Sequence, residues 1–454
     1  MTNITVTDRP ERYSGRLAAF LKTPTAWHII SLVLAFVFIL VLMRHQWFFL
    51  DEWDFLKFKG NGLFDPHVGH WSTSPTLIYW GLRDVFGLHS YWPFATLVIV
   101  AHLSVSHLVW RIARLSGANG WIATGLAASL MVLGAGSENI LWAFQIGFIG
   151  AIAFGLISLL VANRETLTRV GYIGVLAVSL FSLTWSGTSI PIVVATALVL
   201  WRRHGWRRAG LFVAITGGMY VFWLLFAANQ IGDSGGFVPY KVIVLMPLFV
   251  LVMFFVGFAY TIPVLGVGQV AIVALLAWIV RVLIKRRRLA ELLPALALGL
   301  AALVFAILTA YSRATTSVPS GASSRYIYTV FMLLLPLFAV GISRLLRKNR
   351  HAIAWVTAVL IIYVGYNAEV LNRSAQNQAV IEQATRQLMS ASLTLYNEHS
   401  GTIDLAAAPD PRWAINLRMS NLITLHQDGY IDISTFTPND LRTAKINLQY
   451  VPDH

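Results

Sequence analysis

The chain has 454 residues, of which 57% are hydrophobic and 12% are charged, whereas a soluble protein carries about 25% charged residues. This composition excludes a soluble globular protein and predicts an all-α polytopic membrane protein. The net charge of +14 does not indicate nucleic-acid binding, because the basic residues form short clusters between apolar segments, and the lack of cysteine excludes disulfides and thiolate metal sites.

The first apolar run extends from Trp27 to Met43 and follows a basic stretch. After it come Arg44, His45 and Gln46 rather than the small residues of a signal-peptide cleavage site. We therefore expect residues 1–25 to be a cytoplasmic N-terminus and the run to be a retained first transmembrane helix. The basic residues that precede it are Arg9, Arg12, Arg16 and Lys22.

The loop at residues 45–91 concentrates ionisable groups directly after this helix. Carboxylates and imidazoles exchange protons near neutral pH, and a carboxylate in a cavity at the membrane surface gains proton affinity by desolvation. We predict that the loop carries the active site of a membrane enzyme. The alternative is a solvated helix end, which acids commonly decorate. The ionisable groups are Asp51, Glu52, Asp54, Asp65, His67 and His70.

A mixed group of acids and histidines can also hold a divalent cation such as Mg²⁺ or Mn²⁺. No tight ligand spacing such as H-E-x-x-H occurs in the loop. The sequence therefore leaves open whether the protein uses a metal.

A run of apolar segments follows the loop. The loop itself ends in Thr73–Leu88, whose apolar face and nearby tryptophans predict a helix at the membrane interface. Clusters of Arg and Lys fall where alternate crossings return to the cytoplasm, which leaves residues 45–91, 134–142, 229–241, 312–325 and those after 370 outside. We expect a transmembrane domain at 26–370 with about ten to twelve membrane segments.

Two stretches are irregular. Residues 171–201 have cytoplasmic charge at both ends, so they must cross twice with arms shorter than a full span, turning at Trp185–Ser189. Residues 242–284 contain two apolar runs where the charge pattern requires an odd number of crossings, so one of the runs is expected to be re-entrant, with Pro263 at the bend.

Two further loops on the same side carry polar residues. Glu138, Asn139 and Gln145 follow glycines that permit close approach of the backbone to a ligand, although a plain hairpin would use similar residues. Arg313 and Arg325 bracket a loop placed outside, against the usual distribution of positive charge. Guanidinium groups bind phosphate oxygens in a bidentate manner, so these arginines are candidate phosphate ligands.

Two histidines, His102 and His107, lie within a predicted span. Ionisable residues inside a membrane are often functional. A neutral histidine also serves as a hydrogen-bonding residue between helices, and we favour this structural role.

The chain changes character at residue 371. A polar stretch with helical spacing is followed after Gly401 by short, proline-containing segments. We expect residues 371–454 to form a small domain outside the membrane, too short to hold a large core alone and docked on the membrane part.

Several of these segments resemble the GT-C superfamily of polyprenyl-phosphate-dependent glycosyltransferases. The resemblance covers roughly residues 25–345 and rests on a first helix that ends in an acidic pair, a large outer loop with an interfacial helix, and many spans. The segments most similar to bacterial members of this kind are Asp51–Phe55, Asp65–Trp71, Glu138–Gln145 and Ser324–Tyr326.

The resemblance implies transfer of one sugar from a polyprenyl-phosphate donor to a hydroxyl of a glycan, lipid or protein acceptor at the outer face of the cell membrane. It implies that Asp51 or Glu52 is the catalytic base, and that Arg313 and Arg325 hold the lipid phosphate. We also predict substrate contacts from the other polar residues of the loops, namely Asp54, His67, His70, Glu138, Gln145 and Tyr326. Some members use a divalent cation and others do not.

Two alternatives remain beside the glycosyltransferase. A glycan polymerase or ligase relies on a large outer loop late in the chain, whereas here the rich loop comes first. A flippase or other transporter of lipid-linked sugars places polar residues at mid-membrane and often has repeated halves. This chain concentrates its polar residues at the outer rim and contains no detectable repeat.

Overall fold

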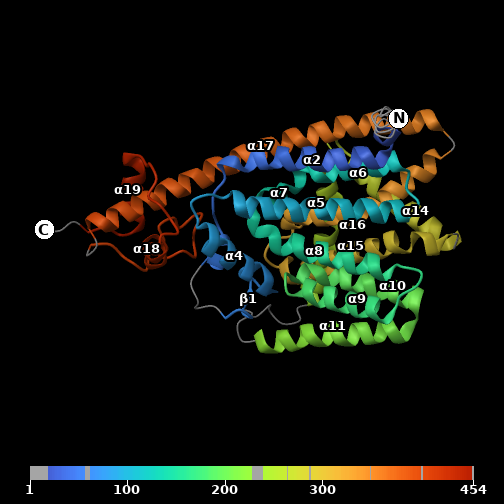
Figure 1. Ribbon diagram of the computed structural model, residues 1–454, viewed down its shortest axis with the longest axis horizontal. Coiled ribbons are helices and arrows are strands. Elements are labelled where there is room, and N and C mark those ends of the chain that lie inside the picture. Colours follow the sequence, from blue (N-terminus) through green and yellow to red (C-terminus); the bar gives the residue numbers. More distant parts are fainter. Residues whose placement is uncertain are drawn as a thin grey trace, which may run out of the picture.

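A computed structural model describes residues 19–56, 62–227, 239–262, 264–285, 288–347, 349–399 and 402–451. In Figure 1 long helices run side by side as a bundle, and helix α17 (Arg350–Glu398) continues past one end of it to the small helices α18 (Met419–Gln427) and α19 (Pro438–Asn447). The expectations for residues 1–18, for most of the loop at 229–241 and for Pro263 lie outside the described residues.

Helices make up almost all of the regular structure in the described ranges. The first half contains α2 (Pro24–Leu42), η1 (Met43–His45), α3 (Glu52–Leu56), α4 (Thr73–Phe86), α5 (Trp92–Leu115), α6 (Gly120–Met131), η2 (Gly134–Gly136), α7 (Ser137–Leu141), η3 (Ala143–Gln145), α8 (Ile146–Ala162), α9 (Arg169–Leu183), η4 (Gly187–Ser189), α10 (Ile190–His204) and α11 (Trp206–Ala227). The second half contains η5 (Lys241–Leu245), α12 (Met246–Leu251), η6 (Val252–Val256), α13 (Gly257–Thr261), α14 (Val267–Lys285), α15 (Leu289–Arg313), η7 (Pro319–Ala322) and α16 (Ser324–Leu346). Two short strands, β1 (Pro66–His67) and β2 (His70–Trp71), pair antiparallel.

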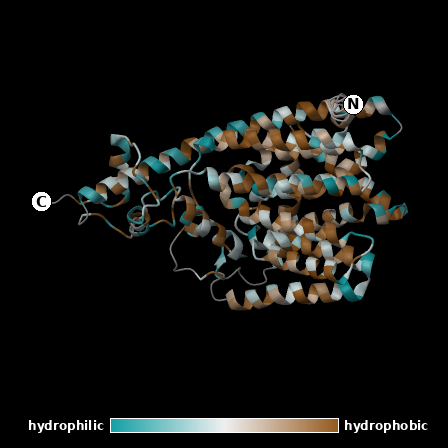
Figure 2. Ribbon diagram, viewed as in Figure 1, coloured by the Kyte–Doolittle hydropathy of each residue, from teal (hydrophilic) through white to brown (hydrophobic). Residues whose placement is uncertain are grey.

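Many of these helices are long and apolar enough to cross a membrane. The described residues contain nine such helices, or ten if the pair of α6 and the segment Gly134–Leu141, bent by 46°, counts as one span. Figure 2 shows apolar residues over the bundle and hydrophilic residues on the C-terminal part and at helix connections. The chain is thus an all-α, multi-pass membrane protein, as its composition predicts.

The stretch at 171–201 forms two short arms, α9 and α10, of 15 residues each. The break between them contacts the start of α4, where the Ser74 amide donates to the Thr184 carbonyl at 3.0 Å and the two hydroxyl oxygens lie 2.7 Å apart. A broken helix in a membrane needs such partners for its freed backbone groups. The two short arms and the break between them match the arrangement expected for this stretch.

The second irregular stretch also forms two helical segments, Lys241–Thr261 and α14. Phe249 lies near Tyr326 at the start of α16, with ring centroids 6.3 Å apart. Trp278 of α14 lies near the end of α16, where the Arg344 guanidinium carbon is 5.9 Å from its ring centroid. Each of the two segments is by itself long and apolar enough to cross a membrane, and the bend expected at Pro263 lies outside the described residues.

Basic residues gather at one end of the bundle, called the basic end below. Arg203 at the end of α10 donates to the Ala290 carbonyl at the start of α15 (3.0 Å), and to the Asn163 side chain after α8 (3.2 Å). Arg344 near the end of α16 lies 3.6 Å from the Glu291 carboxylate. The described parts of the connections at 45–91, 134–142 and 312–325 lie at the opposite end, called the site end.

Helix α17 continues without a break through residue 370, where the sequence analysis places the start of a separate domain. Its 49 residues correspond to a length of about 74 Å, more than twice the ~30 Å hydrocarbon core of a bilayer. Beyond residue 370 it packs against α18 and α19 and buries Leu388, Met389, Leu393 and Leu395. The C-terminal region is thus joined to the bundle by one continuous helix.

Gly150 in α8 makes room for the Trp185 ring at the break between α9 and α10. A Cβ at this position would overlap that ring, whereas a Cβ at Gly174 in α9 would meet nothing within 4 Å. We expect Gly150→Ala to destabilise the protein by about 1–3 kcal/mol, as overpacking does. Thermal unfolding of the purified protein, with Gly174→Ala as the matched control, measures this. Equal melting temperatures for Gly150→Ala and the wild type would contradict the packing described.

Candidate active site

The loop after α2 is anchored by buried aromatic side chains. Trp47 and Trp53 are buried, with ring centroids 5.5 Å apart, and Trp47 donates from its indole nitrogen to the Leu88 carbonyl at 3.1 Å. Leu50 has a φ of 52°, in the left-handed region that few non-glycine residues occupy. The chain turns at this residue, so the two acids that follow it face different surroundings.

Asp51 lines a cavity of about 80 Å³ at the site end. The cavity lies between the first loop, the break between α9 and α10, and the facing ends of α15 and α16. The structure thus brings together the carboxylate, the histidines and the arginines that the sequence analysis selected from separate loops. The predicted residues in the lining are Asp51, His67, His70, Arg313, Arg325 and Tyr326.

A tight hairpin holds the two histidines beside each other. His67 of β1 pairs with His70 of β2, and the turn residues Val68 and Gly69 have φ values of 48° and 78°. Positive φ at both turn residues is the geometry of a type I′ hairpin, which glycine adopts without strain. Directly opposed residues point to the same face of a hairpin, so both imidazoles reach the cavity.

Asp51 is subject to opposing influences on its proton affinity. Burial raises the pKa of Asp51, and the nearby Asp54 raises it further, whereas His67, Arg325 and Arg313 lower it. The net result is a pKa above the ordinary value for aspartate. Asp51 is therefore a carboxylate in the cavity whose surroundings favour the uptake of a proton.

His70 responds in the opposite direction. Burial lowers the pKa of His70 to about 4, and the charge of Arg313 contributes. The imidazole is therefore neutral at pH 7, so it adds hydrogen-bonding capacity to the cavity without adding charge.

Glu52 has no exposed surface and is not part of the cavity lining. Its Oε1 accepts hydrogen bonds from the hydroxyls of Tyr79 (2.7 Å) and Tyr91 (2.9 Å), and its Oε2 accepts one from the Phe49 amide (3.1 Å). Burial raises the pKa of Glu52 to about 8, although these hydrogen bonds oppose the shift. The structure therefore separates the acidic pair, with Asp51 facing the cavity and Glu52 inside the protein.

Arg325 joins two loops at the edge of the cavity. Its Nε lies 3.3 Å from Oε2 of Glu138, and the Glu138 amide donates to the Ser324 hydroxyl at 3.1 Å. Glu138 thus contacts the site through Arg325. Gln145 differs, because it is fully buried outside the lining and its side chain has no hydrogen-bond partner within the described residues.

Asp51, Asp54 and His67 form a group that could hold a cation. One ligand atom from each lies within 4.8 Å of the others. Two carboxylates and one imidazole suit Mn²⁺ or Zn²⁺ better than Mg²⁺, which prefers oxygen ligands alone. Asp54 also accepts a hydrogen bond of 2.8 Å from the Asn416 side chain, and Asp65 accepts one from the Gly62 amide.

The sequence analysis missed several residues of the lining. Trp185, Ser186 and Thr188 come from the break between α9 and α10, which was identified only as a problem of topology. A broken helix inside a membrane typically lines a cavity, so this signal was available. Thr309 and Ser312 of α15 also line the cavity, and nothing in their sequence surroundings indicates it.

His102 and His107 lie away from the cavity and have partners within the bundle. The Nδ1 atom of His102 is 2.8 Å from the Tyr328 hydroxyl, and its Nε2 is 3.0 Å from the Met131 carbonyl. The Nδ1 of His107 is 3.2 Å from Nε2 of His28. These contacts between helices agree with the structural role favoured from the sequence.

Two crystal structures of ArnT from Cupriavidus metallidurans, a GT-C glycosyltransferase, are similar to the chain over most of its length. The structure bound to undecaprenyl phosphate covers 93% of this chain and 88% of its own, with 13% sequence identity and a TM-score of 0.51. The apo structure covers 94% and 89%, with 13% identity and a TM-score of 0.52. The chain has a GT-C fold. No family model matches the sequence, and no curated protein matches it.

The GT-C fold brings together the segments on which the resemblance was based. Asp51–Phe55, Asp65–Trp71, Glu138–Gln145 and Ser324–Tyr326 each contribute at least one residue to the lining of the same cavity. Four segments that are far apart in the sequence therefore meet at the site end.

Proposed function

We propose that the protein is a membrane glycosyltransferase that transfers a sugar from a polyprenyl-phosphate donor to a hydroxyl of a cell-envelope glycan, lipid or protein. The observation that carries this proposal is one cavity lined by Asp51 together with Arg313 and Arg325, whose charges act on the Asp51 carboxyl. A group that takes up a proton and groups that neutralise a leaving phosphate are what the reaction requires.

A second cavity supports a lipid donor. It has a volume of about 770 Å³, is mostly apolar, and follows α15 from Leu289 to Leu303, just before the polar cavity begins at Phe305. An isoprenoid chain lying there would bring its phosphate to Arg313. The similar ArnT structure contains undecaprenyl phosphate, which is a carrier of this chemical class.

Asp51 serves as the general base in this reaction. The acceptor oxygen attacks the anomeric carbon and its proton passes to Asp51, while the bond from that carbon to the phosphate oxygen breaks. Arg313 and Arg325 neutralise the charge that develops on the polyprenyl phosphate. A single displacement of this kind inverts the configuration at the anomeric carbon. A cation at Asp51, Asp54 and His67 would add positive charge beside the phosphate.

The charge pattern supports an orientation. Arginines and lysines that flank membrane helices favour the cytoplasm, and they gather at the basic end of the bundle. The N-terminus then lies in the cytoplasm, and the cavity and the C-terminal region lie on the outer face of the cell membrane.

The proposal is tested by transfer of labelled sugar from a panel of synthetic polyprenyl-phosphate sugars to lipid, glycan and peptide acceptors. Purified protein is used with and without a chelator, which also tests the cation. Turnover with one donor is the expected result. Donor binding with neither transfer nor hydrolysis, for every donor and acceptor, would overturn the proposal and favour a transporter of lipid-linked sugars.

Arg313→Ala and Arg325→Ala are each expected to raise the KM for the donor by about 10- to 100-fold. Hydrogen bonds to charged groups contribute about 1.5–3 kcal/mol, and each change removes one phosphate ligand. Initial rates at varied donor concentration measure the effect. Arg442→Ala, an exposed arginine on α19, is the matched control and should leave the KM unchanged. Unchanged KM values in both cavity variants would remove these arginines from the donor site.

A further inference from the structure

The segment at residues 409–417, between α17 and α18, lies against the loop that carries Asp51, and it is called the C-terminal clamp below. The Leu50 amide donates to the Trp413 carbonyl at 2.5 Å. The Asn416 side chain donates to Oδ2 of Asp54 at 2.8 Å, across 362 positions of sequence. Both contacts are made to residues within three positions of Asp51.

The clamp is itself held in place from both sides. The buried Asp410 accepts a hydrogen bond from the Thr385 hydroxyl of α17 at 2.9 Å, and its other oxygen accepts from the amides of Arg412 and Trp413 at 3.1 Å each. The Asn447 side chain after α19 donates to the Pro409 carbonyl at 2.9 Å. The clamp is therefore a fixed part of the C-terminal region rather than a segment that only borders the site.

The contact with Trp413 is made by Leu50, whose backbone conformation is unusual. A leucine in the left-handed region is held there by its surroundings, because its own preference is for negative φ. The hydrogen bond from its amide to Trp413 fixes one side of the turn, and the hydrogen bond from Phe49 to Glu52 fixes the other. The direction of the Asp51 side chain depends on this turn.

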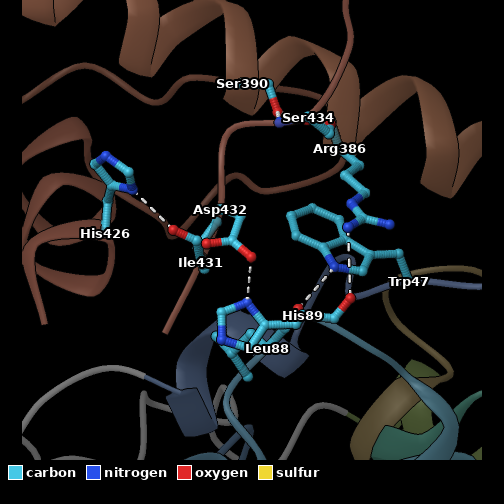
Figure 3. A network of polar contacts seen from close by, with 9 residues as sticks. All are labelled: Trp47, Leu88, His89, Arg386, Ser390, His426, Ile431, Asp432 and Ser434. Carbon is cyan, nitrogen blue, oxygen red and sulfur yellow. Dashed lines mark hydrogen bonds and ion pairs between the residues drawn. The ribbon is translucent and has the colours of Figure 1, made fainter. Parts of the chain in front are cut away.

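Further contacts tie the C-terminal region to the rest of the loop, as Figure 3 shows. The Arg386 guanidinium of α17 lies 5.6 Å from the Trp47 ring centroid and 3.4 Å from the His89 carbonyl oxygen. The His89 ring pairs with Asp432 at 2.8 Å, and the Leu88 amide donates to the Tyr430 carbonyl at 2.8 Å. Both ends of the loop are thus fixed to the same region that carries the clamp.

We infer that the C-terminal clamp sets the geometry of the catalytic loop, and that Asn416 is a positioning residue which orients the Asp54 carboxylate beside Asp51 and His67. Asp54 lies with these two residues within 4.8 Å, so the hydrogen bond from Asn416 reaches the reacting groups through one side chain. The inference rests on the proposed function, because Asp51 is its base.

A double-mutant cycle on the purified full-length protein tests this. Asn416→Ala is expected to lower kcat by about tenfold with a nearly unchanged KM for the donor, since misplacement of a catalytic group acts on the chemical step. In an Asp54→Ala background the same change is expected to have no further effect. Asn439→Ala, an exposed asparagine of α19, is the matched control. A kcat equal to the wild type, or an equal loss in both backgrounds, would overturn the inference.

A second measurement keeps the inference testable without turnover. Asn416→Asp places a second carboxylate against Asp54 and is expected to lower the melting temperature, and the exchanged pair Asp54→Asn with Asn416→Asp is expected to recover it. If the wild type transfers no sugar, the proposed function fails, whereas recovery of the melting temperature still supports the contact. If the exchanged pair did not recover the melting temperature, the inference about the C-terminal clamp would be overturned, whatever the activity.

Discussion

Asp51→Asn is expected to reduce sugar transfer by about 10²–10⁴-fold, which is the usual contribution of a general base. Asparagine keeps the size of the side chain and its place in the cavity, but it cannot accept the proton of the acceptor hydroxyl. The measurement is kcat with a donor that the wild type uses. Because burial raises the pKa of Asp51, wild-type activity should also fall on the acidic side at a pH above the ordinary range of aspartate.

The same assay needs a folded control. Asp428→Asn changes an exposed aspartate after α18 and should keep wild-type activity. Melting temperatures of both variants near that of the wild type would attribute the loss to chemistry. If Asp51→Asn retained more than a tenth of the activity, Asp51 would not be the base, and Asp54 would become the next candidate.

The buried carboxyl of Glu52 leads to the second large effect, which concerns stability. The folded pKa is about 8 and the ordinary value is 4.5, so between these pH values the folded protein keeps a proton that the unfolded chain releases. The contribution of Glu52 to stability is therefore complete below about pH 4.5 and is lost as the pH rises to about 8, at up to about 1.4 kcal/mol per pH unit.

Glu52→Gln should flatten this dependence, because an amide does not titrate. Melting temperatures from pH 5 to about pH 9 measure the slope in both proteins. The buried Glu382 of α17, which accepts a hydrogen bond from the Trp47 amide at 2.9 Å, interacts with Glu52 and remains in the variant. The expected result is thus a reduced slope. An identical slope would assign the pH dependence to other groups.

Glu52→Ala is expected to be far more damaging than Glu52→Gln. It leaves the buried hydroxyls of Tyr79 and Tyr91 and the Phe49 amide without their acceptor, with an expected loss of about 3–5 kcal/mol. Glu398→Ala, at the exposed end of α17, is the control and should stay within about 0.5 kcal/mol of the wild type. Equal stability of Glu52→Ala and Glu398→Ala would show that the hydrogen bonds to Glu52 do not stabilise the loop.

The general position of the site could be predicted from the sequence because charged groups are rare in this chain. In a membrane protein, a charged side chain needs water, an oppositely charged partner or a ligand beside it. Asp51, Arg313 and Arg325 could therefore be selected as candidate site residues one at a time. The charge pattern also fixed the common side of the loops that carry them. The fold class followed from the scarcity of charged residues and from their pattern along the chain.

The distinction between Asp51 and Glu52 could not be predicted. The two residues are neighbours of similar chemistry, and which of them faces the cavity depends on the φ of Leu50 and on the hydroxyls of Tyr79 and Tyr91. These residues carry no pattern that reveals such a role. The contact of Asn416 with Asp54 was equally hidden, because it joins two ordinary polar residues that only the complete fold brings together.

The order in which a ribosome makes the chain gives the clamp a further consequence. The loop with Asp51 leaves the ribosome early, but its hydrogen bonds to Trp413 and Asn416 must wait until more than 350 further residues have been synthesised. Contacts of such sequence separation form late, since the chain between them must be ordered first. During biosynthesis the incomplete chain would therefore have its first membrane helices inserted while the loop that carries Asp51 still lacks its hydrogen bonds to Trp413 and Asn416. If the protein has the proposed function, a nascent chain would therefore transfer no sugar from a lipid donor before its C-terminal region is in place.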